Sequence, residues 1–337
     1  MRDLYIFVVS NKKTGGGHLS RQNKIIKKLR VPCKIITLEN SIIDDETIEL
    51  VDDIILIKVF DYKQIEGIVE HDSVLIFDPP YYEKELNTYE SAKEFCFLDR
   101  LRQKNIRVIY FTDEFLARTR PVSLVVNGYL ESEELEEIYS RDGADSIVGI
   151  DSFLFSYDRD RDVANPDESC KKVFINFGYF DQHSLASGIR EVIRLLSDSG
   201  CVVNFVGQES SLTSSEEILN LNIFANLKQK EFLDLLAKAD LAIVSAGNVN
   251  YERMLLGVPG ISIPQFGRQA VYSMVADKLG VSLHLDSLSY LKSAVTDWIE
   301  GDLSRISQQC IRLDQFSSQN EQPGNLLVHK IKSCIFG

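Results

Sequence analysis

The sequence predicts an α/β protein of two units, each with a parallel sheet that helices cover on both faces. Short, almost wholly apolar runs alternate with helix-period segments from the N terminus onwards, and such strands are typical of parallel sheets covered on both faces. The alternation stops at a polar, charged stretch that contains Pro166 and then starts again. The length of 337 residues also corresponds to roughly two domains.

The first run of this alternation predicts an N-terminal unit over residues 1–157. Apolar runs that predict strands lie at residues 4–9, 33–38, 54–57, 73–77, 107–111, 123–126 and 146–148. Helix-period segments lie between several of these runs, at residues 19–29, 64–69, 92–104 and 132–139. Residues 158–171 have no apolar periodicity, so we expect them to link the two units.

The second run predicts a C-terminal unit over residues 172–337. Strands are expected at residues 172–177, 202–206, 222–224, 241–244 and 260–264, and helices at residues 184–197, 229–238, 249–256, 271–279 and over much of 288–335. Each unit is therefore Rossmann-like. Two such units facing each other across a cleft form the GT-B fold, in which ligands bind at the carboxyl ends of the strands.

Composition excludes several classes of function. The net charge of −13 argues against a nucleic-acid partner, because binding a phosphate backbone needs clustered Lys and Arg. No apolar run approaches the ~18 residues that span a bilayer, and the first run is too short for a signal-peptide core. The six cysteines form no Cys-x-x-Cys pair, which is typical of reduced thiols in a cytoplasmic protein. We therefore expect a cytoplasmic protein without a membrane span.

Two glycine-bearing turns point to an anionic ligand. Each follows a predicted strand and opens a predicted helix, which directs unpaired N–H groups and a partial positive charge at one point, as a phosphate requires. The first turn contains Gly15, Gly16, Gly17 and His18. The second contains Ser245, Ala246, Gly247 and Asn248, and its helix carries Glu252. A nucleotide-sugar is the ligand that two facing sites of this kind would suit.

His18 is the candidate catalytic residue of the first turn. The start of a helix favours a neutral imidazole that can accept a proton, although a capping histidine without a catalytic role would occupy the same place. Asp78 and Asp113 each follow a predicted strand, and Tyr81 comes shortly after Asp78. These side chains lie at the same sheet edge as His18, where ordinary strand-end polarity is an equally good interpretation.

The second unit offers the candidate nucleotide site. Glu252 is placed to accept both hydroxyls of a ribose, or else it complements the helix dipole. Phe224 and Ala225 end a strand where backbone groups could pair with a pyrimidine, although a core aromatic explains Phe224 as well. Arg268 and Gln269 follow the strand at 260–264 and could reach the sugar or the phosphates. No metal-ligand spacing occurs in the sequence, so we expect no metal and no cofactor.

The motif Gly15-x-Gly17-His18-x-x-Arg21 resembles the GxGHxxR signature of the UDP-sugar hydrolases of pseudaminic acid biosynthesis. That family includes spore-coat polysaccharide proteins of the same type and belongs with the GT-B glycosyltransferases. Further pieces resemble it in order along the chain, at residues 110–114, 123–127, 149–154, 174–181, 245–252, 257–259 and 269. Several family patterns differ here. Val9-Ser10-Asn11 replaces an Arg-x-Asp, Asp78-Pro79-Pro80-Tyr81 replaces an Asp-His-Tyr, the glycine loop is two residues shorter, and Tyr179 replaces a turn glycine.

The resemblance implies roles for individual residues. It makes His18 the catalytic residue, with Asp78 and Tyr81 beside it, and it makes Glu252 the ribose-binding residue. It implies that the phosphates of UDP bind at the turn of Ala246, Gly247 and Asn248. Together with the positions singled out above, the expected UDP site comprises Phe224, Ala225, Ser245, Ala246, Gly247, Asn248 and Glu252. The substrate side would comprise Gly15, Gly16, Gly17, Arg21, Asp113, Arg268 and Gln269.

Three functions follow as hypotheses. The first is metal-independent hydrolysis of a UDP-linked amino or deoxy sugar, such as a UDP-diacetamido-trideoxyhexose. It would release UDP and free sugar in surface-glycan or nonulosonic acid biosynthesis, with enzymes of that pathway as partners. The second is a GT-B glycosyltransferase that uses a UDP-sugar donor. The third, which the altered Arg-x-Asp and Asp-His-Tyr motifs favour, is an inactive subunit that binds a sugar-nucleotide.

Overall fold

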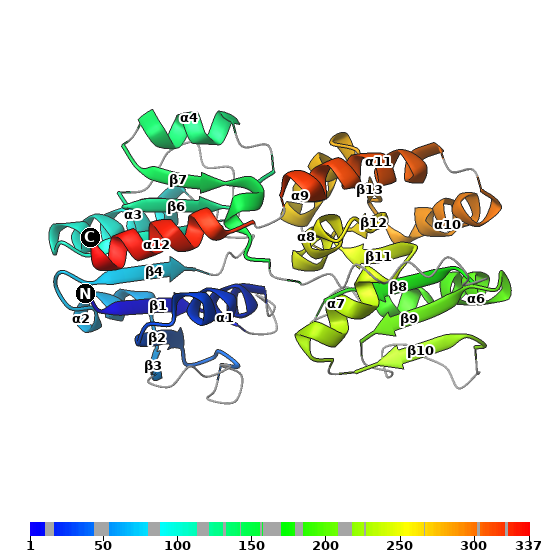
Figure 1. The fold of residues 1–337 in the computed structure, drawn as a ribbon. Helices are drawn as coiled ribbons and strands as arrows, with labels where there is room; N and C mark the ends of the chain where they lie inside the picture. The colour runs from blue at the N-terminus through cyan, green and yellow to red at the C-terminus, as the bar shows by residue number, and fades with distance from the viewer. Residues whose placement is uncertain are drawn as a thin grey trace. The chain divides into compact units, whose positions relative to one another are not determined.

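The chain divides into two compact units (Figure 1). Unit 1 comprises Met1–Leu154 and Gln322–Gly337, and unit 2 comprises Phe155–Glu321. The structure is a computed structural model, and it describes residues 1–10, 17–43, 54–79, 88–112, 121–130, 133–141, 143–155, 157, 170–178, 185–207, 218–225, 227–265, 267–301, 304–320 and 323–337.

Unit 1 is built on a seven-stranded parallel sheet of order β3-β2-β1-β4-β5-β6-β7. The strand order runs outward from β1 in one direction and from β4 in the other, so the topological switch point lies between these two strands. The strands are β1 (Leu4–Val8), β2 (Cys33–Leu38), β3 (Ile54–Val59), β4 (Val74–Asp78), β5 (Arg107–Thr112), β6 (Leu124–Asn127) and β7 (Asp145–Val148).

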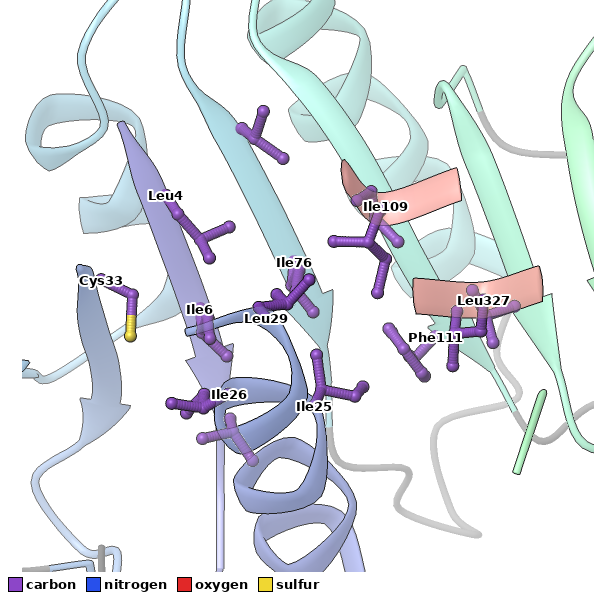
Figure 2. Packing of buried hydrophobic residues seen from close by; sticks show 14 of the residues in the cluster. Leu4, Ile6, Ile25, Ile26, Leu29, Cys33, Ile76, Ile109, Phe111 and Leu327 are labelled. Atoms are coloured by element: carbon purple, nitrogen blue, oxygen red, sulfur yellow. The ribbon is translucent and has the colours of Figure 1, made fainter. Parts of the chain in front are cut away.

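Helices cover both faces of this sheet. Successive side chains of a strand point to opposite faces, and here both faces carry apolar side chains that the helices bury. Ile6 belongs to one core cluster and Phe7 to the other. Figure 2 shows side chains of α1 and α12 gathered on the face that carries Ile6, Ile76 and Ile109. The helices of unit 1 are α1 (Gly17–Leu29), α2 (Ile65–Ile68), α3 (Thr88–Gln103), α4 (Glu133–Arg141) and α12 (Asn325–Phe336), with 3-10 turns η1 (Tyr62–Gln64) and η2 (Gly149–Ser152).

Unit 2 repeats the plan on a six-stranded parallel sheet of order β10-β9-β8-β11-β12-β13, with its switch point between β8 and β11. The strands are β8 (Lys172–Asn176), β9 (Val202–Val206), β10 (Leu221–Phe224), β11 (Leu241–Ser245), β12 (Gly260–Ile263) and β13 (Leu283–His284). The helices are α5 (Leu185–Gly188), α6 (Arg190–Asp198), α7 (Gln229–Ala237), α8 (Asn248–Leu255), α9 (Gly267–Lys278), α10 (Leu291–Glu300) and α11 (Ser304–Gln319), with 3-10 turn η4 (Leu288–Tyr290).

The predicted class, two α/β units with parallel sheets, is confirmed by these topologies. No helix in the described part of the chain is both long enough and apolar enough to cross a membrane. Residues 158–169, which hold most of the expected linker, lie outside the described residues. The expected cleft between the units stays a prediction.

The C-terminal helix differs from the sequence-based assignment. We expected all of 172–337 in one unit, but α12 belongs to unit 1. Its buried side chains Leu327, Ile331 and Ile335 are part of the core cluster on the α1 face of the first sheet. An apolar stripe tells which face of a helix is buried, but it does not tell which sheet the helix covers.

Gly324 allows the returning chain to enter unit 1. Its φ is +83°, in the left-handed region, and it precedes the first residue of α12. A Cβ atom at this position would lie 2.9 Å from Leu154 Cδ2 and 3.0 Å from both Leu154 Cα and Phe153 O. A side chain therefore meets two obstacles here, the backbone conformation and the neighbouring main chain.

We predict that Gly324→Ala destabilises unit 1 by about 2 kcal/mol or more, because alanine has both the left-handed penalty and the steric conflict. Gly143→Ala is the matched control: Gly143 has φ +75° in the same unit, with nothing within 4 Å of its added Cβ. Urea unfolding of both variants measures the difference. Equal losses of stability would show that the contact with Leu154 is unimportant.

Candidate functional site

Asp78 is the centre of the polar cluster at the switch point of unit 1. It is the last residue of β4, lies in register with Val8 of β1 and is fully buried. His18 Nδ1 lies 2.7 Å from its Oδ1, and Arg21 donates from Nη2 to Oδ1 (2.6 Å) and from Nε to Oδ2 (3.2 Å). Gln22 Nε2 donates to Oδ2 at 2.7 Å. Three side chains of α1 thus surround one carboxylate.

The sequence of α1 explains this convergence. Residues 18, 21 and 22 are spaced at i, i+3 and i+4, so they share one face of the first turns of the helix. The same face continues with the buried Ile25, Ile26 and Leu29. The helix is therefore apolar where it covers the middle of the sheet and polar where it passes the end of β4.

Asp78 is held as a carboxylate. Burial opposes its charge, but the Arg21 guanidinium and the hydrogen bonds from His18 and Arg21 outweigh burial and hold the pKa of Asp78 well below its ordinary value. A carboxylate only accepts hydrogen bonds, so His18 Nδ1 carries the proton that it shares with Asp78. The lone pair of the imidazole then lies on Nε2, and the ring is partly exposed. This is the arrangement of an oriented general base.

The structure gives Arg21 a partner that sequence reasoning missed. Its Nε and Nη2 both bind Asp78, and the guanidinium lies over the ring of Phe111, 5.0 Å from the centroid. Sequence reasoning also missed Gln22. Substrate binding by Arg21 stays a prediction. Of the other predicted residues of this unit, Gly17 is the first residue of α1, whereas Gly15, Gly16, Tyr81 and Asp113 lie outside the described residues.

Unit 2 has a small-residue cradle at its own switch point. It comprises Gly178 after β8, Ser245 at the end of β11, Gly247 before α8 and Gln269 on α9. A Cβ atom on Gly178 would lie 3.7 Å from Ser245 Oγ, and one on Gly247 would lie 3.5 Å from Gln269 Nε2. A hydroxyl and an amide therefore gather around backbone that carries no side chains. That combination at a helix start suits a phosphate group.

Neighbouring groups fix this cradle. Gln269 Oε1 accepts a hydrogen bond from Gln265 N at 2.8 Å, which leaves its Nε2 on the side of Gly247. Gln265 Nε2 in turn donates to Phe177 O at 2.5 Å, next to Gly178. The cradle residues of β8 and α9 are thereby joined through Gln265, another residue that sequence reasoning left unassigned.

Glu252 lies on α8 as expected, and it is buried. Gln229 Nε2, at the start of α7, lies 3.3 Å from its Oε1. The helix begins at Asn248, directly after Gly247, and Ala246 is buried with its N–H bonded to Ile263 O at 3.3 Å. The predicted turn residues therefore form one strand-to-helix junction with Glu252 one turn further on.

Three further residues of unit 2, Phe224, Ala225 and Arg268, were predicted to contact the ligand. Phe224 is half-buried at the end of β10 and packs against the core cluster that contains Val206, as its structural interpretation expects. Ala225 follows it and is exposed. The side chain of Arg268 lies outside the described residues. A nucleotide role for these three residues stays a prediction.

Arg253 is a buried cation that joins α8 to neighbouring turns. Arg253 is fully buried, donating from Nε to Asn250 Oδ1 (2.8 Å) and from Nη1 to Val258 O and Val281 O (3.0 Å each). Burial lowers the pKa of Arg253 to about 9. The residue ties α8 to the turns that lead into β12 and β13.

Within the described part of the chain, no group of three or more His, Cys, Asp or Glu residues is placed to hold a metal ion.

Comparison with known proteins shows which solved structures have the same fold. No family model and no curated protein matches the sequence. The spinosyn forosaminyltransferase SpnP matches over 99% of both chains, with 10% identity and a TM-score of 0.66. LpCGTa in complex with UDP matches over 100% of both chains, with 13% identity and a TM-score of 0.66. UDP-glucose: anthocyanidin 3-O-glucosyltransferase in complex with UDP matches over 99% of both chains, with 14% identity and a TM-score of 0.63.

The chain has the fold of these glycosyltransferases. At 10–14% identity the likeness establishes the fold alone. The predicted GT-B class is confirmed, whereas the predicted kinship with UDP-sugar hydrolases has no support beyond its short motifs.

We predict that Asp78→Asn lowers the free energy of unfolding by about 3 kcal/mol at pH 7, because it removes the buried carboxylate that pairs with the partly buried Arg21. The folded pKa of Asp78 lies below its unfolded value, near 4, so its contribution is full above that pH and declines as the pH falls further. The difference between wild type and variant should therefore shrink by about 1 kcal/mol between pH 5 and pH 3.

Urea unfolding at pH 7, 5, 4 and 3 measures this difference. Asp151→Asn removes an exposed carboxylate of the same unit and serves as the control. A difference for Asp78→Asn that stays constant down to pH 3 would contradict the depressed pKa.

Proposed function

We propose that the protein is a glycosyltransferase that moves a sugar from a UDP-sugar donor to a hydroxyl acceptor. The observation that carries this proposal is the His18–Asp78 pair at the switch point of unit 1, in a chain with the fold of glycosyltransferases. The pair provides a base, and the cradle of unit 2 provides a place for the diphosphate.

His18 acts as the general base. Its Nε2 takes the proton of the acceptor hydroxyl as that oxygen forms a bond to the anomeric carbon of the sugar. The bond between this carbon and the diphosphate oxygen breaks, and UDP leaves with the electron pair. Asp78 keeps Nδ1 protonated and stabilises the imidazolium that forms.

Unit 2 binds the donor. The N–H groups at the start of α8 face the negative charge that develops on UDP, with Ser245 Oγ and Gln269 Nε2 as further donors. Glu252 accepts the ribose hydroxyls, and Gln229 orients its carboxylate. UDP is the proposed nucleotide because it is present in solved structures of the same fold.

Hydrolysis of a UDP-sugar would use the same residues with water in place of the acceptor. The motif around His18 favours hydrolysis, but the fold comparisons support transfer. The two reactions differ in one measurable property, because transfer stops without an acceptor and hydrolysis does not. An inactive subunit would bind UDP and release nothing.

The test is UDP release from a panel of UDP-sugars, with and without a panel of hydroxyl acceptors, in buffer containing EDTA. We expect release that depends on acceptor and persists in EDTA. Equal release without any acceptor would replace this proposal with the hydrolase, and binding of UDP without release over hours would replace it with the inactive subunit.

We predict that His18→Ala lowers kcat by roughly 10²- to 10⁴-fold, the contribution of a positioned base. The dissociation constant for UDP should stay unchanged, because UDP binds at unit 2. His329→Ala, which removes an exposed histidine of unit 1, is the control. A His18→Ala enzyme with the turnover of wild type would remove His18 from the mechanism.

A further inference from the structure

Four polar side chains lie together between α9, β12 and β13. They are the buried Ser262 of β12, Ser273 of α9 and Ser282, which directly precedes β13, and the partly buried His284 of β13. Ser262 Oγ lies 2.5 Å from Ser273 Oγ and 2.9 Å from Ser282 Oγ, and His284 Nδ1 lies 2.8 Å from Ser273 Oγ. On its outer side, His284 Nε2 lies 2.9 Å from the exposed Asp286 Oδ1.

These bonds form one consistent chain when His284 is neutral. Its Nε2–H donates to Asp286, so its Nδ1 accepts from the hydroxyl of Ser273. Ser273 Oγ then accepts from Ser262, and Ser262 Oγ accepts from Ser282. The order resembles a Ser-His-Asp triad, but Ser273 is fully buried, so no substrate reaches its hydroxyl. The network is a structural connection and not a nucleophilic site.

The network joins the donor cradle through α9. Gln269 precedes Ser273 by four residues, so both lie on the same face of the helix. Helix α9 packs on β12 and β13, the strands that carry Ser262 and His284. The hydrogen bonds of Ser273 therefore fix the position of α9 along the sheet. That position decides where Gln269 Nε2 lies relative to Gly247.

Apolar packing alone would fix this helix less strictly. Apolar contacts tolerate small shifts between helix and sheet, whereas a buried hydroxyl that loses its partner bears a desolvation penalty. A satisfied buried network therefore selects one placement of the helix. Gln269 contacts the cradle through a single amide, so a shift of α9 by part of a turn would remove it.

We propose that Ser273 and His284 are positioning residues that hold Gln269 in the donor site. The inference rests on the proposed function, because it assigns Gln269 to the binding of the donor diphosphate. It predicts that loss of the Ser273–His284 bond weakens nucleotide binding through Gln269 and by no other route.

The experiment is a double-mutant cycle on UDP affinity, measured by calorimetric titration at a temperature where every variant is folded. We expect Ser273→Ala and His284→Ala each to raise Kd for UDP about tenfold, the effect of about 1.4 kcal/mol. His284→Asn should restore most of the affinity, because its Oδ1 can accept from Ser273 in place of Nδ1. Ser273→Ala should have no further effect in a Gln269→Ala protein.

Val203→Ala is the matched control, since it removes buried volume from unit 2 on β9, away from α9. It should lower the melting temperature and leave Kd for UDP unchanged. Wild-type affinity in Ser273→Ala, or a full further loss in the Gln269→Ala background, would overturn the positioning role while the donor site stands. A wild-type protein that fails to bind UDP would overturn the proposed function itself.

Discussion

A buried negative charge at the end of β4 constrains how α1 packs on the sheet of unit 1. A carboxylate without water needs opposite charge and donors around it, and the first turns of α1 supply them from His18, Arg21 and Gln22. The helix must therefore begin beside β4 with that one face toward the sheet. The same requirement gives the histidine its tautomer and its orientation, so the base of the proposed reaction follows from the electrostatics of the core.

The switch point of unit 2 has the features of a diphosphate site and not those of a buried charge. A site for a diphosphate needs hydrogen-bond donors and little side-chain bulk, and Gly178, Gly247 and Ser245 provide that combination. The charge buried in this unit is a cation, Arg253, which lies under α8 and binds carbonyl groups at the ends of neighbouring turns. Unit 1 therefore buries a carboxylate that orients the proposed base. Unit 2 buries polar groups that hold helices around the cradle.

The sequence predicted most of the strands and the strand-to-helix junction that contains Gly247, because continuous apolar runs and glycines at strand ends have a direct physical cause. It placed α12 in the wrong unit, since Leu327 and Ile331 mark a buried face without naming the sheet it meets. His18 was found from its turn, but Gln22 and Ser273 were not. Single polar residues inside helices carry no periodic signal, and their burial depends on partners that are distant in sequence.

The bond between Arg21 and Asp78 bears on how the proposed base works. An isolated carboxylate beside an imidazole would favour the imidazolium, which has no lone pair with which to accept a proton. Arg21 balances the charge of Asp78 through two hydrogen bonds, and the same carboxylate orients the ring of His18. As the acceptor proton arrives at Nε2, the Asp78 oxygen 2.7 Å from Nδ1 is already in place to stabilise the new charge. A ring held in this way presents Nε2 to the acceptor and has its counter-charge already in place, which is what the proposed transfer to a hydroxyl requires.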